Sequence, residues 1–139
     1  MYALLTRLMF KYLSPERARG LSHDTRKSDV WSLGVTFFEI LIGRTPFEKS
    51  DGEQFHTKED LEKYWGRTLR GKWVGTWDFS KDMERLLHRM MSPNADLRFT
   101  AKQAMSDVYW QMQTQDVLHS KLFWVLAIHF LTNPNRTFV

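Results

Sequence analysis

Histidines are the residues of this 139-residue sequence whose side chains most readily bind metals or transfer protons near neutral pH. The five of them share no ligand-like spacing: His23, His56, His88, His119 and His129. No H-E-x-x-H pattern occurs, and the absence of cysteine excludes disulfides and cysteine–zinc sites. We therefore predict no metal site in this chain.

The possible nucleophiles and paired carboxylates of the sequence do not indicate a catalytic site either. The sequence contains no G-x-S-x-G pattern, and the order of its serines, histidines and acids does not specify a catalytic triad or an acid–base pair. No catalytic residue is predicted on these grounds. The function has to be sought in the elements that the chain can build.

Composition indicates one small globular domain, since 42% of the residues are apolar and 14% are aromatic. The formal charge is +4, but Lys and Arg are scattered among acids, which favours a solvated surface over a nucleic-acid or membrane partner. The apolar residues 122–131 are too few to span a bilayer, and residues 1–10 lack the features of a secretory signal. We expect an intracellular protein, cytoplasmic or nuclear.

Residues 28–42 are strongly apolar and predict a buried helix. Their apolar side chains occupy nearly the whole helical circumference, which is typical of a helix covered on all sides. Ser28 is the expected cap, Asp29 places a negative charge at the positive end of the helix dipole, and Gly43 follows the last turn. Gly34 indicates close backbone packing. A buried strand is the alternative, because β-branched and aromatic residues are frequent here.

Further helices are indicated where a capping residue is followed by apolar residues at helical spacing. Residues 57–60, Thr-Lys-Glu-Asp, form a capping box; Ser80 caps a second helix, and Thr100 with Gln103 forms another box. The apolar residues of these three helices are Leu61, Tyr64, Trp65 and Leu69, then Met83, Leu86, Leu87, Met90 and Met91, and then Ala101, Ala104, Met105 and Val108. For the first of them, core packing is favoured over a binding patch.

The loop at residues 71–79 is aromatic and punctuated by glycine. Trp73, Trp77 and Lys72 could stack on and neutralise a nucleic acid. The loop carries only one other charge, Asp78, and it connects two helices. Packing is therefore the favoured interpretation.

Residues 29–47, D-V-W-S-L-G-V-T-F-F-E-I-L-I-G-R-T-P-F, closely resemble the central F helix of the C-lobe of eukaryotic serine/threonine protein kinases. Residues 12–16, Y-L-S-P-E, resemble the Ala-Pro-Glu motif that closes the activation segment, with Ser14 in place of alanine. Residues 97–101 resemble the late arginine of the family and the start of its last helix. The three matches agree in order and spacing.

The resemblance implies a mostly α fold: a partial protein-kinase C-lobe with F, G, H and I helices around a buried central F helix, and no nucleotide lobe. Residues 11–110 are expected to form this truncated C-lobe. Residues 1–10 and 111–139 do not match, and the tail carries spacing for one more helix. The residues that match structural motifs of the family are Pro15, Glu16, Asp29, Trp31, Gly34 and Arg98.

Two of these residues have a role that the resemblance implies. Glu16 is expected to pair with Arg98 and so to tie the activation segment to the lower helices. Asp29 accepts hydrogen bonds from the catalytic-loop backbone in the family. That loop is missing from this sequence, so Asp29 is expected to interact only with the start of its own helix.

Catalysis in this family transfers the γ-phosphoryl group of ATP to protein hydroxyls and uses Mg²⁺. It requires a Gly-rich loop, an ATP-anchoring Lys, a catalytic-loop Asp and Asn, and an Asp-Phe-Gly motif. None of these occurs in the sequence. The resemblance thus implies a kinase fragment that binds neither ATP nor Mg²⁺ and is inactive on its own.

The alternative is a non-catalytic module that docks protein substrates or partners through the G helix. Its candidate docking residues are Leu61, Tyr64 and Trp65. Because the upstream helices of a kinase normally cover the F helix, we also expect an exposed apolar surface that needs a partner. A nucleic-acid binder would require a clustered positive face, which the sequence does not indicate.

Overall fold

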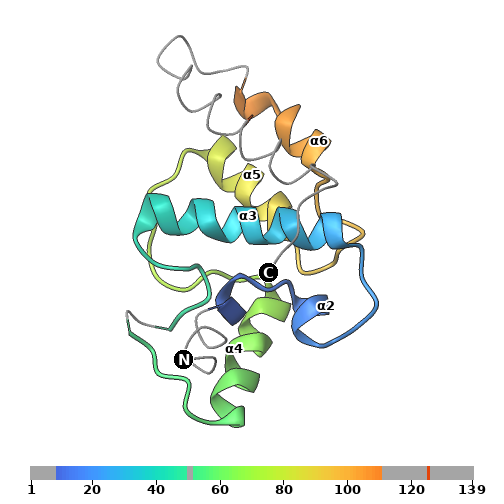
Figure 1. Cartoon of the computed structure of the whole chain (residues 1–139). Helices are drawn as coiled ribbons and strands as arrows, with labels where there is room; N and C mark the ends of the chain where they lie inside the picture. Colours follow the sequence, from blue (N-terminus) through green and yellow to red (C-terminus); the bar gives the residue numbers. More distant parts are fainter. Residues whose placement is uncertain (1–8, 50–51, 111–124, 126–139) are drawn as a thin grey trace.

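Helix α3, Thr25–Ile42, crosses the middle of the molecule in the computed structural model (Figure 1). The predicted helix is confirmed and the strand alternative is wrong. The helix begins one turn earlier than predicted, because the Asp24 carboxylate caps it by accepting a 2.9 Å hydrogen bond from the Arg26 amide. Asp is as good a capping residue as Ser. Ser28 and Asp29 consequently lie inside the helix instead of at its start.

The structure describes residues 9–49, 52–110 and 125, and within them it contains helices and no β-strand. Besides α3, the elements are η1 (Phe10–Tyr12), α2 (Pro15–Ala18), α4 (Lys58–Arg70), α5 (Lys81–Met90), α6 (Ala101–Met105) and η2 (Val108–Trp110). In Figure 1, α5 and α6 lie on one side of α3, and α2 and α4 lie on the other. The predicted tail helix falls outside the described residues apart from Val125.

Most of the large apolar side chains in the middle of α3 are buried, whereas those in its last turn are not. Trp31, Val35 and Phe38 have no exposed surface, whereas Ile40 is 61% exposed and Leu41 is 49% exposed. Figure 1 gives the reason, since the C-terminal end of α3 extends past α5. The prediction of a helix covered on all sides is therefore wrong for the last turn.

The predicted capping motifs of α4 and α5 are confirmed. Thr57 and Asp60 form a reciprocal capping box at the start of α4, and Ser80 accepts a hydrogen bond from the Met83 amide at the start of α5. Each cap satisfies a backbone N–H that has no partner inside its helix. These local bonds explain why both helices begin where the sequence indicates.

The last predicted helix is shorter than expected. The capping box of Thr100 and Gln103 forms, but α6 ends at Met105 and the chain continues in a separate 3₁₀ turn. Asp107 accounts for the break: its carboxylate accepts a 2.9 Å hydrogen bond from the Tyr109 amide and a 2.5 Å hydrogen bond from Arg85. A side chain that caps a new turn competes with continuation of the helix.

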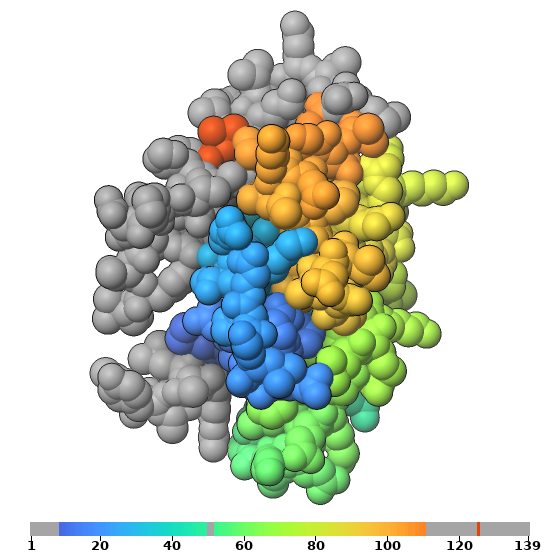
Figure 2. All heavy atoms as spheres, turned by 90° about the vertical axis from the view of Figure 1, so that its right-hand side faces the viewer, coloured from blue at the N-terminus to red at the C-terminus, as the bar shows by residue number. Residues whose placement is uncertain are grey.

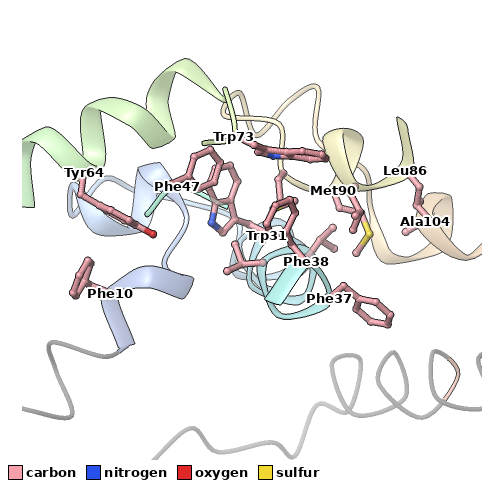
Figure 3. Close-up of a cluster of buried hydrophobic side chains, with 14 of the residues drawn as sticks. Phe10, Trp31, Phe37, Phe38, Phe47, Tyr64, Trp73, Leu86, Met90 and Ala104 are labelled. Atoms are coloured by element: carbon pink, nitrogen blue, oxygen red, sulfur yellow. The ribbon is translucent and has the colours of Figure 1, made fainter. Parts of the chain in front are cut away.

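Aromatic side chains fill the core on both sides of α3 (Figure 3). On the α4 side, Trp31 stacks on Phe47 with ring centroids 5.5 Å apart. On the α5 side, Phe38 meets the edge of Trp73, which belongs to the loop at residues 71–79, at 5.1 Å. Trp73 is 3% exposed and stacks against His88. The packing interpretation of this loop is confirmed for Trp73.

Gly34 lies where α3 packs against the end of α5. A Cβ atom at this position would be 2.8 Å from Met91 Cγ and 3.2 Å from Met90 Cβ. Both methionines are buried, with exposed fractions of 1% and 0%. The close backbone packing that the sequence predicted is confirmed.

Gly34→Ala is expected to lower the free energy of unfolding by about 1–3 kcal/mol, because overpacking outweighs the better helix propensity of alanine. Urea unfolding of the purified chain measures the change.

Gly66→Ala is the matched control, since Gly66 lies inside α4 and a Cβ atom there would meet nothing closer than Arg70 Nη1 at 3.7 Å. At this position the same substitution should stabilise the chain by about 0.5–1 kcal/mol. Equal effects of the two substitutions would contradict the packing argument.

Candidate functional site at the Glu16–Arg98 junction and the α4 face

Arg98 and Glu16 form a bidentate ion pair across 82 positions of sequence. Nη1 of Arg98 donates to Oε1 of Glu16 at 2.6 Å, and Nη2 donates to Oε2 at 2.9 Å. The Arg98 residue is 1% exposed, so its charge is held away from water. The pairing that the resemblance implied is present in the structure.

The remaining hydrogen bonds of Arg98 go to the backbone of two other segments. Its Nε donates to the Ser92 carbonyl at 2.9 Å, and its Nη1 also donates to the Lys27 carbonyl at 3.0 Å. The guanidinium lies 5.1 Å from the ring centre of Trp31, in cation–π geometry. One side chain thus joins α2, the first turn of α3 and the chain after α5.

Two serines support the carboxylate of the pair. Ser28 Oγ donates to Glu16 Oε1 at 3.2 Å and lies 2.8 Å from Ser14 Oγ. Burial raises the pKa of the Glu16 carboxyl, but the hydrogen bonds and charge of Arg98 outweigh burial and lower that pKa from 4.5 to about 2. Glu16 therefore stays ionised throughout the neutral and mildly acidic range.

The other family-matched residues occupy structural positions. Pro15 is buried at the first position of α2, and Trp31 is fully buried in the core. Asp29 is 6% exposed and lies in the second turn of α3. The expectation that Asp29 lies at the start of its helix is wrong, because Asp24 supplies the cap and the helix begins earlier.

The predicted docking residues of α4 differ in their accessibility. Tyr64 is 1% exposed, and its hydroxyl donates to the Lys11 carbonyl at 3.2 Å. Tyr64 therefore belongs to the core and cannot contact a partner, which corrects the prediction for this residue. Leu61 and Trp65 are half-buried, and Leu69 is 46% exposed on the same helix.

A surface hollow of about 590 Å³ lies along the outer face of α4. Its lining residues are Lys49, Glu59, Glu62, Lys63, Gly66, Arg67, Arg70 and Val74. Arg67 is fixed at one wall, since its Nη2 contacts both Glu53 carboxylate oxygens at 2.7 Å and its Nε donates to the Phe47 carbonyl at 2.8 Å. The hollow has walls of both charge signs.

Sequence reasoning missed a second buried ion pair, between Lys11 and Glu48. Glu48 is 5% exposed, pairs with Lys11 and accepts a 3.0 Å hydrogen bond from the Thr45 amide. Burial raises the pKa of Glu48, while the bonds from Lys11 and Thr45 outweigh it and lower that pKa. By sequence pattern, Glu48 begins a polar loop. Its place directly after Pro46 and Phe47 is the signal that could have identified it.

Across residues 9–49, 52–110 and 125, no three His, Cys, Asp or Glu side chains are placed to hold a metal ion. Within the same residues, no helix has the length and apolar character needed to cross a membrane.

Comparison with known proteins defines the class of this chain. The family model for the protein kinase domain matches residues 6–110, beginning slightly before residue 11, where the motif resemblance starts. The chain therefore belongs to the protein kinase domain family. Its helical structure is that of a partial C-lobe, and the resemblance to eukaryotic serine/threonine protein kinases is confirmed.

Individual relatives come from rice, Oryza sativa subsp. japonica. CBL-interacting protein kinase 19 is 29% identical over 100 residues, which cover 72% of this chain and 18% of the relative. CBL-interacting protein kinase 5 is 30% identical over 100 residues, which cover 72% of this chain and 20% of the relative. The matching part thus spans about a fifth of the length of these relatives.

Glu16→Gln is expected to lower the free energy of unfolding at pH 7 by about 3–5 kcal/mol, because it leaves the buried Arg98 charge without its partner. Since the pKa of Glu16 is lowered on folding, the ion pair stabilises the wild type above pH 4.5, and this contribution is lost as the pH falls towards 2. Urea unfolding at pH 7 and pH 3 measures both effects.

Glu62→Gln serves as the control, because Glu62 pairs with Lys58 at 3.7 Å on the surface of α4. An exposed pair contributes about 0–1 kcal/mol, so this variant should follow the wild type at both pH values. The assignment is contradicted if Glu16→Gln keeps the full acid sensitivity of the wild type.

Proposed function

We propose that this kinase-derived chain is a non-catalytic protein-interaction module that docks partner proteins through α4 and does not transfer phosphoryl groups by itself. One observation carries the proposal. The described residues build a well-packed set of helices with an accessible α4 face, while the sequence contains none of the family's ATP-binding or catalytic motifs.

The loss of catalysis follows from how phosphoryl transfer is accelerated. Charge that develops on the transferred group is stabilised by Mg²⁺ and by a positioned Lys, and the attacking hydroxyl is oriented by the catalytic-loop Asp. These contributions depend on groups held in place before the reaction begins. A chain without the corresponding motifs has no means of providing them.

The proposed docking surface consists of Leu61, Trp65 and Leu69 on α4. Its supports are the 46% exposure of Leu69 and the partial exposure of Leu61 and Trp65, which also pack against the core. The charged hollow lies on another face of α4, since none of these three residues lines it. Tryptophan side chains often dominate binding energies at protein interfaces. A core of apolar side chains with a charged rim is the usual composition of such an interface.

A partner protein would also cover the exposed C-terminal end of α3. Ile40 and Leu41 present large apolar side chains to solvent on successive positions. Covering about 100 Å² of apolar surface is favourable by about 2.5 kcal/mol. We therefore include these two residues in the surface that a partner protein would cover.

The purified chain is expected to give no phosphate incorporation above background into a mixture of serine- and threonine-containing substrate proteins with ATP and Mg²⁺. A radiolabelled ATP assay measures this, and heat-inactivated chain is the control for contaminating kinases. Incorporation that scales with chain concentration and persists after further purification would contradict the proposal.

Trp65→Ala is expected to weaken binding of a docked partner by about 30-fold, the effect of losing about 2 kcal/mol at an interface tryptophan. Partners are recovered by affinity capture with the wild-type chain, and each is then titrated in purified form against both chains.

Tyr64→Phe is the matched control, because it changes an aromatic side chain on the same helix that is 1% exposed. It should leave partner affinity unchanged while removing the hydrogen bond to the Lys11 carbonyl. Partners that bind the wild type, Trp65→Ala and Tyr64→Phe chains equally would contradict docking through α4.

A further inference from the structure

Residues 17–27 hold most of the net positive charge of the chain, although charge is mixed elsewhere. This stretch, the basic segment, contains Arg17, Arg19, Arg26 and Lys27 against the single acid Asp24, a formal charge of +3 compared with +4 for the whole chain. The segment joins α2 to α3. Figure 2 shows α2 and the start of α3 exposed on one face of the molecule, next to the chain that follows α5.

The backbone of the basic segment is held in a fixed turn. The Leu21 amide donates to the Glu16 carbonyl at 3.0 Å, and the Gly20 amide donates to the Arg17 carbonyl at 3.1 Å. These two bonds make the Schellman motif that ends α2. Gly20 has a φ of 66°, a left-handed conformation that favours glycine. Arg17 and Arg19 are therefore displayed from an ordered backbone.

The acids nearest to these cations in the sequence are already engaged. Glu16 is committed to Arg98, and Asp24 caps α3 and pairs with Arg26 at 3.3 Å. Arg17 and Arg19 are exposed, and among the residues that the structure describes neither guanidinium has a hydrogen-bond or ion-pair partner. Two arginines on a rigid turn are thus left available for an anionic ligand.

We propose that the basic segment binds an acidic peptide segment of a partner protein, with carboxylates on Arg17 and Arg19 and an apolar side chain on Leu21. Leu21 is 48% exposed between the two clusters of cations. Arg pairs with carboxylates in a bidentate geometry, which suits a peptide rich in Asp or Glu. This surface shares no residue with the docking surface on α4, although α2 and α4 are in contact.

A peptide suits this surface better than a nucleic acid. Proteins that bind single-stranded nucleic acids combine basic grooves with aromatic side chains that stack on the bases. Residues 17–27 contain no Phe, Tyr or Trp. The exposed apolar residue of the segment is an aliphatic leucine, which packs on an aliphatic or aromatic side chain of a peptide.

Fluorescence anisotropy of a labelled peptide tests the proposal, with six glutamates flanking one leucine as the probe. The double substitution Arg17→Ala with Arg19→Ala should raise the Kd at least tenfold at physiological salt. The double substitution Lys81→Ala with Lys102→Ala removes the same charge from exposed positions on α5 and α6 and should leave the Kd within twofold. Circular dichroism confirms that both chains fold.

Two further probes decide between specific recognition and general charge attraction. Leu21→Ser should weaken binding of the leucine-containing peptide and leave binding of an all-glutamate peptide unchanged. An oligouridylate of the same net charge should bind more weakly than the peptide. Equal losses for the two double variants, or tighter binding of the oligouridylate, would overturn the proposal without affecting docking through α4.

Discussion

The buried guanidinium of Arg98 sets a constraint that several separate segments have to meet. A charge that is 1% exposed loses its hydration and has to find compensating partners inside the protein. Those partners come from Glu16, from the Ser92 carbonyl and from the Lys27 carbonyl. These partners belong to α2, the chain after α5 and the first turn of α3. Arg98 can therefore make all of its bonds only when these three segments are packed together. The pair specifies an arrangement more than it adds net stability, since desolvation offsets much of its attraction.

The aromatic core and this ion pair meet at Trp31. Its ring stacks on Phe47 and lies 5.1 Å from the Arg98 guanidinium. Helix α3 supplies the surface on which α5 packs, and Gly34 lets the two helices approach closely. At its last turn this packing ends, and Ile40 and Leu41 are left facing solvent. Such apolar surface is a common feature of interaction sites.

The two proposed surfaces use different physical chemistry. The proposed docking surface on α4 consists of the apolar residues Leu61, Trp65 and Leu69, so its binding would depend mainly on buried area and shape. The basic segment presents Arg17 and Arg19 with no internal partner among the described residues, so its binding would depend on charge and on salt. The basic segment follows Glu16 in the chain, and α4 contacts α2, the helix that carries Glu16.

Local patterns in the sequence determined much of this protein. The caps at Thr57, Ser80 and Thr100 and the apolar run of α3 predicted the helices, because side-chain-to-backbone bonds and helical spacing act over a few residues. The motifs around Glu16 and Arg98 identified the kinase family.

Long-range packing decided the rest. It buried Tyr64, exposed Ile40 and brought Glu48 to Lys11. Such contacts join residues that are far apart in the chain, so a local sequence pattern does not predict them. The cations of residues 17–27 were interpreted from the sequence as part of a surface of mixed charge. Only the tertiary structure, by committing Glu16 to Arg98, showed Arg17 and Arg19 without a partner among the described residues.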